Sequence, residues 1–283
     1  MGQVLKRFHE LEKDLRLARA QKDAGGRQVP GQCPDLAALP PELSLLVLSH
    51  LNATDLCLAG CVWQDLAEDE LLWQGLCFKQ FGPISSCRAR RRDPRFSYRT
   101  LYLELDEGRL TFNADPIVGM EYMLRNRLLD NSPDDIARFM HFSKNLDNVS
   151  KREFLKDRRD VLEELVKLQN FENQFLPNAL RKFFQETHPP NDRGSYLHDL
   201  VDKFSERFCA CNPSLGLPKD SVYVVCFSLI LLSVDLSSPH IKNKMSKREF
   251  IRNTRQAAHG VNDEFAGHLY DNVYLIGHVA PRS

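Results

Sequence analysis

The sequence predicts an all-α protein. Three segments carry patterns that start helices: Ser132 before Pro133, Ser150 with Glu153, and Ser246 with Glu249. In such patterns a serine hydroxyl accepts a hydrogen bond from a free backbone N–H of the first turn, and proline fits the first helical position. The chain contains no Asn-Gly or Asp-Gly pair, the strongest short signal for a β-hairpin. Local signals therefore favour helices over strands.

Composition limits the classes of protein to which the chain can belong. Its 283 residues suffice for about two domains. Lys plus Arg and Asp plus Glu number 38 each, so the charge excess typical of a nucleic-acid-binding protein is absent. A hydrophobic content of 42% with 27% charged residues is typical of a globular protein. We expect protein partners and no nucleic acid.

The eight cysteines do not predict a metal site. No Cys-x-x-Cys motif is paired with a second one or with a spaced pair of histidines, the patterns that zinc sites require. Charged residues interrupt any apolar run near the N-terminus, so we interpret the cysteines as reduced thiols of a cytoplasmic protein. No metal and no cofactor is expected.

Residues 1–36 are expected to form an amphipathic and flexible tail. Apolar residues recur at helical spacing within residues 1–22, where six basic residues outnumber three acidic ones. Two interpretations stay open: a helix that is solvated or docks on the chain's own body, and a helix that lies on a membrane surface. Gly2 permits N-myristoylation, although Lys6 stands where the pattern has serine or threonine. Membrane contact is expected to be at most peripheral.

Residues 37–84 contain more large apolar side chains than so small a module can bury. The sequence Leu-Pro-Pro-Glu-Leu from Leu39 to Leu43 predicts the start of a first helix, and Thr54 is expected to cap a second. Two short helices are expected to follow. The excess of apolar side chains is expected to face a partner protein.

This module resembles the F-box. A Leu-Pro-x-Glu-Leu start, a Leu-Asn-x-x-Asp-Leu centre, a Cys-x-x-x-Cys-Val-Trp run and a closing Leu-Leu-Trp match the family between Leu39 and Trp73. The resemblance implies a three-helix module that binds the Skp adaptor of an SCF-type (cullin) ubiquitin ligase. It assigns adaptor contacts to Leu39, Pro40, Leu43, Leu51, Leu56, Val62 and Trp63. Several of these side chains are also expected to form the core of the module.

An arginine-rich stretch, residues 85–108, separates this module from the rest of the chain. Six arginines and one aspartate fall within the twelve residues 88–99. We interpret the stretch as a solvated basic linker, and binding of acidic lipid or a phosphopeptide is the alternative.

The most apolar segment is residues 222–234, in which 11 of 13 residues are apolar. It is shorter than the roughly 20 residues needed to cross a bilayer. A lone strand here would leave its backbone groups without partners. The segment is therefore expected to be a buried helix that is capped near Asp220 or Ser221.

Residues 109–275 resemble the Sec7 (Sec-seven) domain, the catalytic unit of exchange factors for Arf GTPases. Matching stretches start at Phe112 (Phe-Asn-Ala-Asp-Pro) and Asn178 (Asn-Ala-Leu-Arg-Lys-Phe) and continue through residues 204–212 and 222–239. The resemblance implies a superhelical stack of about ten helices, with residues 276–283 as a C-terminal tail. It also implies a GTPase-binding groove formed by Pro190, Phe227, Ser228, Ile230, Leu231, Ser233, Asp235 and Ser238. Plain core packing is the alternative role of these residues on the apolar helix.

In the Sec7 family a carboxylate on a loop facing the groove displaces the bound nucleotide, because it repels phosphate and competes for Mg²⁺. The matching residue here is Asp192, which is one methylene shorter than the family's glutamate and has Arg193 beside it. A shorter acid reaches less far into a buried site. Capping of the following helix is the alternative role of Asp192.

The two resemblances lead to two functional hypotheses. The first is an adaptor: the F-box docks on the ligase while the Sec7 domain binds an Arf GTPase and regulates it, by ubiquitination or by sequestration. The second is an active guanine-nucleotide exchange factor whose F-box controls its abundance or placement. The altered loop around Asp192 favours the adaptor.

Overall fold

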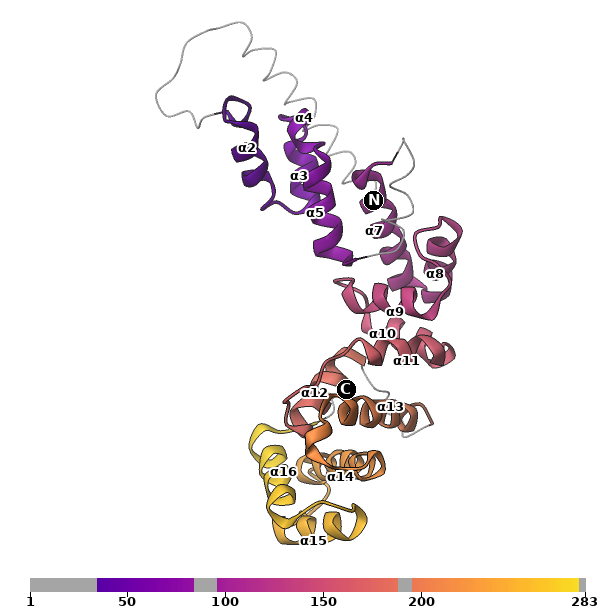
Figure 1. Cartoon of the computed structure of the whole chain (residues 1–283), viewed down its shortest axis with the longest axis vertical. Coiled ribbons are helices and arrows are strands. Elements are labelled where there is room, and N and C mark those ends of the chain that lie inside the picture. Colours follow the sequence, from indigo (N-terminus) through magenta and orange to yellow (C-terminus); the bar gives the residue numbers. More distant parts are fainter. Residues whose placement is uncertain (1–34, 84–95, 188–194, 280–283) are drawn as a thin grey trace, which may run out of the picture. The chain divides into compact units, whose positions relative to one another are not determined.

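The computed structural model describes residues 35–83, 96–187 and 195–279, and within these ranges all regular elements are helices (Figure 1). The prediction of an all-α fold is confirmed. The described chain divides into two compact units, with the boundary between Asp106 and Glu107. This boundary falls inside one helix, α7 (Tyr98–Ala114), whose first part belongs to the first unit and whose second part belongs to the second.

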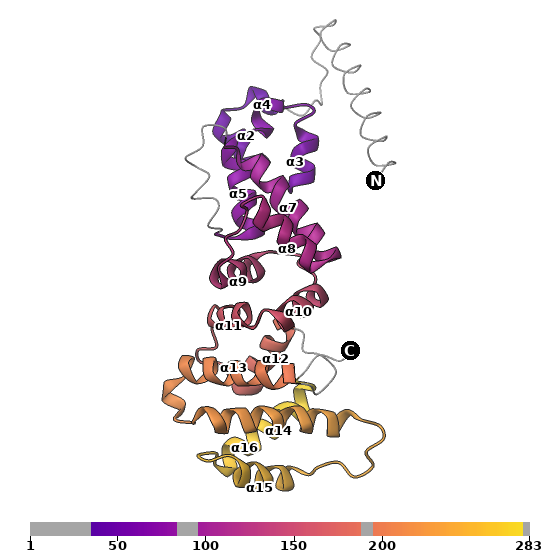
Figure 2. The same ribbon diagram turned by 90° about the vertical axis from the view of Figure 1, so that its right-hand side faces the viewer.

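The first unit consists of short helices. They are the 3₁₀ turn η1 (Leu36–Ala38), α2 (Pro41–Leu48), α3 (Ala53–Ala59), α4 (Gln64–Ala67) and α5 (Glu70–Phe81), followed by the start of α7 (Figure 2). The four helices α2 to α5 agree with the four that the residue patterns predict, one more than the three that the resemblance to the F-box implies. The predicted cap at Thr54 is wrong: Asn52 is the N-cap, and its Oδ1 accepts the backbone N–H of Asp55 at 2.9 Å.

The core of the first unit forms around Trp73. Its ring packs edge-on against Tyr102 with 5.6 Å between centroids, and Phe81 packs against the same tyrosine at 5.5 Å. The indole N–H of Trp73 donates to the carbonyl of Ala67 at 2.8 Å, so this buried donor is satisfied. The aromatic contacts fix α7 against α5.

The structure differs from the predicted linker at residues 98–108, which are helical. Leu101 and Leu105 on this helix are buried, so burial of an apolar face stabilises it despite the nearby arginines. Residues 84–95, which hold most of the basic run, lie outside the described residues.

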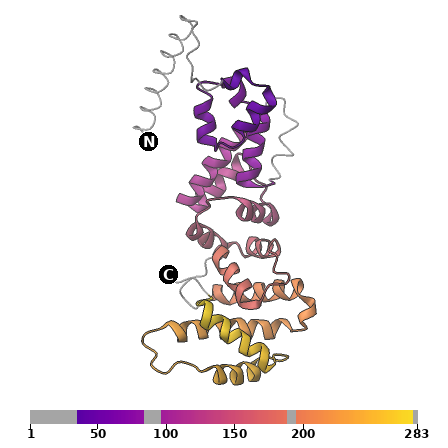
Figure 3. The same ribbon diagram turned by 90° about the vertical axis from the view of Figure 1, so that its left-hand side faces the viewer.

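The second unit comprises the end of α7 and nine further helices among its described residues, in line with the expected ten. They are α8 (Pro116–Arg125), α9 (Pro133–Phe142), α10 (Asn148–Asp157), α11 (Arg159–Lys167), α12 (Leu176–Thr187), α13 (Ser195–Cys211), α14 (Lys219–Ser237), α15 (Lys247–Ala257) and α16 (Asp263–Ile276). Helix α11 packs on α9 and α13, α13 packs on α14, and α14 packs on α15 and α16, so the unit is a stack (Figures 2 and 3).

Two of the three predicted helix starts are confirmed. Ser132 caps α9, and Ser246 caps α15 with a complete capping box. The third is wrong, because α10 begins earlier, with Asp147 as its N-cap. Ser150 lies inside that helix and donates its hydroxyl to the carbonyl of Asn113 at 3.0 Å. A tertiary hydrogen bond thus replaces the local one that the sequence suggested.

The apolar segment forms α14, as expected, but without the predicted cap. Helix α14 starts after Pro218, and no side chain caps it. By length and composition it is the one helix within the described ranges that could cross a membrane, a property that core helices share, and 39% of its apolar window is buried inside the second unit. Its buried face packs against α13 and α16. The residues on this face form part of the core of the second unit.

A cluster of phenylalanines fixes α13 next to α12. Phe204 of α13 lies 5.1 Å from Phe183 of α12 and 5.1 Å from Phe171, measured between ring centroids. All three rings are fully buried. Since burial of one such side chain contributes about 1.5–3 kcal/mol, this cluster holds the helices on either side of the Asp192 loop in place.

Candidate functional site

The loop that carries the predicted exchange residue connects α12 to α13. Residues 188–194, including Pro190 and Asp192, lie outside the described residues. The role of Asp192 therefore stays a prediction. The two helices that flank the loop are described, and so is α14, which carries most of the other predicted groove residues.

One side of α14 is apolar and open to solvent. Leu231 is 49% exposed and Val234 is 41% exposed, while Tyr223, Phe227 and Ile230 are half-buried. These five positions lie on one helical face, since their spacing follows the 3.6-residue period. We call the five residues the α14 face. An uncovered apolar face on a helix that is otherwise packed is typical of a protein-binding surface.

The α14 face brings together the predicted groove residues Phe227, Ile230 and Leu231, and plain core packing does not describe Leu231, which is half exposed. Sequence reasoning missed Tyr223 and Val234. The signal that could have found them was their spacing from Phe227, four residues before and seven after, which continues the same stripe along the helix.

Ser233 does not lie with the other groove residues. It is 3% exposed, its hydroxyl donates to the carbonyl of Leu229 at 2.8 Å, and its oxygen accepts the backbone N–H of Val279 at 3.2 Å. Ser233 therefore holds Val279, which follows α16, against α14, and its hydroxyl is not available for a polar contact with a partner. Ser228 is half-buried and donates to the carbonyl of Val224 at 2.9 Å, at the edge of the α14 face.

The loop after α14 is held by polar contacts. Lys244 Nζ donates to the backbone carbonyl of Asp235 at 2.6 Å and to that of Ser238. The Asp235 carboxylate accepts the backbone N–H of Met245 at 2.7 Å. These bonds satisfy carbonyls that a helix end leaves free. The predicted residues Asp235 and Ser238, both half-buried, thus form a fixed polar edge beside the α14 face.

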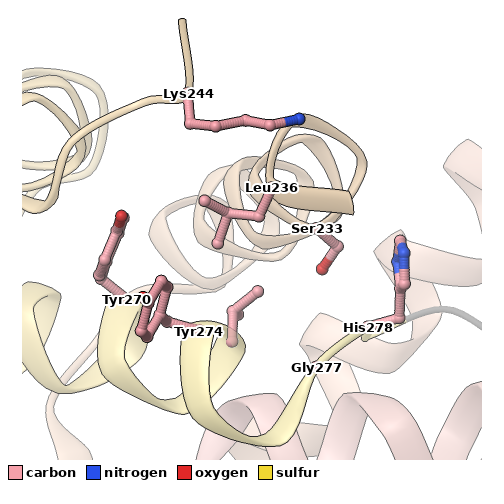
Figure 4. A pocket seen from close by; sticks show the side chains of 8 residues that line it. Ser233, Leu236, Lys244, Tyr270, Tyr274, Gly277 and His278 are labelled. Atoms are coloured by element: carbon pink, nitrogen blue, oxygen red, sulfur yellow. The ribbon is translucent and has the colours of Figure 1, made fainter. Parts of the chain in front are cut away.

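A pocket of about 320 Å³ lies on the other side of the end of α14 (Figure 4). Leu236 and Ser233 line it from α14, and Tyr270 and Tyr274 line it from α16. The two tyrosine rings stack with 6.1 Å between centroids and 12° between planes. The buried Ser233 marks this side of the helix as distinct from the α14 face.

The first unit exposes large apolar side chains, as expected from its composition. Leu43 is 50% exposed, Leu46 59% and Val62 42%. Val47, Leu58, Leu71 and Phe78 are exposed as well. So many exposed apolar residues on a unit of this size indicate a protein-binding surface.

The predicted adaptor-binding residues fall into three groups by exposure. Leu43, Val62 and Pro40 are exposed, and Leu39, Leu51 and Trp63 are half-buried. Leu56 is 1% exposed and belongs to the core. The indole N–H of Trp63 donates to the Asp35 carboxylate at 2.6 Å, which holds the entry turn against α4. A partner protein can reach the exposed residues Pro40, Leu43 and Val62 most directly.

Comparison with known families assigns both units. Residues 102–275 match the family described as Sec7 domain, and residues 36–79 match the family described as F-box-like.

Three related proteins align with most or with part of this chain. The human protein F-box only protein 8 is 60% identical over 252 residues, which is 87% of this chain and 78% of that protein. Human cytohesin-2 is 30% identical over 172 residues, 59% of this chain and 43% of that protein. The Arabidopsis thaliana protein named brefeldin A-inhibited guanine nucleotide-exchange protein 1 is 31% identical over 183 residues, 62% of this chain and 11% of that protein.

Solved structures show the same helical fold. The crystal structure of the Sec7p catalytic domain is 29% identical, with a TM-score of 0.54, and the match covers 60% of this chain and 95% of that one. A Sec7 domain bound to ARF1-GDP and brefeldin A gives a TM-score of 0.55 at 22% identity, over 64% of this chain and 95% of that one. The second likeness concerns the fold alone.

Proposed function

The chain belongs to the Sec7 domain family and carries an F-box-like domain, and from this premise we propose that it is an adaptor: its F-box-like unit binds the Skp adaptor of an SCF-type ubiquitin ligase, and its Sec7 unit binds an Arf-family GTPase. The bound GTPase is regulated, either by ubiquitination or by sequestration. The protein acts in the cytoplasm, with at most peripheral membrane contact.

The observation that carries this proposal is the α14 face. Apolar area contributes to binding only when a partner covers it, and the uncovered part of this helix is apolar along three turns. Relatives named guanine nucleotide-exchange proteins, which are 31% and 33% identical over the matched residues, support a GTPase as the partner. The exposed apolar side chains of the first unit support a second protein partner there.

Nucleotide exchange is the second candidate function. Relatives named guanine nucleotide-exchange proteins favour it. Against it stands the loop sequence, in which Asp192 is one methylene shorter than a glutamate and Arg193 is its neighbour. An adjacent cation reduces the repulsion that the carboxylate exerts on phosphate.

Leu231→Asp tests whether the α14 face binds the GTPase. A carboxylate in an apolar interface loses its hydration without gaining a partner, so binding of ARF1 loaded with GDP is expected to weaken at least about tenfold. The measurement is biosensor titration of the full chain. The matched control is Leu275→Asp on α16, which changes a leucine that is 78% exposed and lies outside the α14 face. Equal binding by both variants would place the GTPase elsewhere.

Release of a fluorescent GDP analogue from ARF1 separates the two candidate functions. The adaptor proposal predicts that the full chain accelerates release weakly or not at all, and that Asp192→Glu raises the rate because it restores the longer acid. A fast release by the wild-type chain that Asp192→Lys removes would establish the exchange factor instead.

A further inference from the structure

An aromatic cluster joins α13 to the first turns of the α14 face. The ring of His198 on α13 stacks on Phe227 with 4.8 Å between centroids and 28° between planes. Tyr223, one turn before Phe227, lies 4.9 Å from it between centroids. His198 is exposed, whereas the other two side chains are half-buried. The cluster therefore extends the apolar face of α14 onto α13 and ends in an exposed imidazole.

A hydrogen bond engages one nitrogen of this imidazole. His198 Nδ1 lies 2.7 Å from the hydroxyl oxygen of Tyr223, and which of the two atoms donates depends on the tautomer of the ring. Burial, together with the negative charges of Asp202 and Asp199, raises the pKa of Tyr223, so the hydroxyl keeps its proton. In the tautomer in which the tyrosine donates to Nδ1, the ring proton of His198 resides on Nε2.

The second ring nitrogen, Nε2, has no hydrogen-bond partner among the described residues. The carboxylates nearest in sequence are committed to cations: Asp199 lies 3.0 Å from Arg159, and Asp202 lies 2.8 Å from Lys219. Among the described residues, His198 forms one hydrogen bond, the bond to Tyr223. A ring nitrogen whose position is fixed by Tyr223 and Phe227 is therefore exposed and, in the described part of the chain, without a partner beside an uncovered apolar face.

We propose that His198 is a specificity-determining residue of the Sec7 unit: its Nε2–H, oriented by Tyr223 and Phe227, donates to a backbone carbonyl or carboxylate oxygen on the GTPase. This inference rests on the proposed GTPase binding. Apolar contacts on the α14 face contribute binding free energy but do not depend on a particular orientation of the partner. A single fixed donor at the edge of that face favours partners that place an acceptor there. Tyr223 and Phe227 act as positioning residues, because they set the tautomer and the plane of the ring.

Two substitutions separate the donor from the ring. His198→Phe keeps an aromatic ring over Phe227 and removes the N–H, so affinity for the GTPase is expected to fall about tenfold, the effect of one lost hydrogen bond with its acceptor left unpaired. His198→Gln keeps an N–H donor of similar reach and is expected to bind within about threefold of wild type. Tyr223→Phe frees the tautomer and is expected to give an intermediate loss.

The experiment is biosensor titration of the full chain and its variants with ARF1 loaded with GDP. His268→Phe, which changes an exposed histidine on α16, is the matched control and is expected to bind like wild type. Unfolding midpoints establish that each variant is folded. Wild-type affinity in His198→Phe, or an equal loss in His198→Phe and His198→Gln, would overturn the role of the donor. Absence of binding by the wild-type chain would overturn the proposed function and this inference with it.

Discussion

At the residue scale, Arg181 connects α12 to the end of α16. Its Nε donates to the carbonyl of His278 at 2.9 Å, and its Nη2 donates to the carbonyl of Gly277 at 2.8 Å. Its Nη1 donates to Asn272 Oδ1 at 2.6 Å. Burial lowers the pKa of Arg181, yet the guanidinium stays charged at neutral pH. One side chain thus satisfies carbonyls that follow a helix end, where no helical partner exists.

Replacing Arg181 is expected to destabilise the second unit. Arg181→Met keeps the length of the side chain and removes all of these donors, so the hydrogen bonds to Asn272, Gly277 and His278 are lost. The expected loss is about 2 kcal/mol of unfolding free energy, measured by urea unfolding, with faster amide hydrogen exchange at Val279. Lys182→Met, at the exposed neighbouring position, is the control. Identical urea midpoints for the two variants would show that these hydrogen bonds contribute nothing.

At the element scale, local signals predicted the existence of helices better than their ends. Ser132 and Ser246 cap helices because their partners lie within the first turn. Ser150 carries the same pattern but bonds to another helix, and α14 starts without any capping side chain. The exposure of α14 was also only partly predictable. Its apolar composition indicated burial, and only the packing of α13 and α16 shows which side stays open.

The candidate site was also only partly predictable from the sequence. The resemblance to the Sec7 family placed Phe227, Ile230 and Leu231 together, but it could not show that Ser233 points into the unit. It also gave no reason to select His198, because the contact with Tyr223 joins residues 25 positions apart. Residues that meet across two helices leave no periodic signal in the sequence.

The packing of α8 on α7 depends on a glycine. A Cβ added at Gly119 would lie 2.3 Å from the backbone N and Cα of Phe112, so the two helices approach too closely for any side chain. Gly119→Ala is expected to cost about 3 kcal/mol of unfolding free energy, because the helices must move apart. The measurement is urea unfolding of the full chain.

Gly75→Ala in α5 is the matched control for that prediction. Nothing lies within 4 Å of a Cβ at Gly75, and alanine favours a helix more than glycine does. This variant is expected to be as stable as wild type or up to about 1 kcal/mol more stable. Equal stabilities for the two variants would contradict the close approach of α7 and α8.

At the scale of the whole molecule, we propose one protein-binding surface on each unit. The first unit exposes Leu43 and Val62, and the second exposes Leu231 and Val234. Because these residues belong to different units, a substitution in one is expected to leave the fold of the other intact. Leu43→Asp should therefore remove binding of the Skp adaptor alone, and Leu231→Asp should remove binding of the GTPase alone.

The most direct test of the adaptor function is size-exclusion chromatography with light scattering on an equimolar mixture of the full chain, the Skp adaptor and ARF1 loaded with GDP. We expect one species with the mass of a 1:1:1 complex, which loses the Skp adaptor with Leu43→Asp and loses ARF1 with Leu231→Asp. Elution of ARF1 apart from a complex of the chain with the Skp adaptor would contradict the adaptor function.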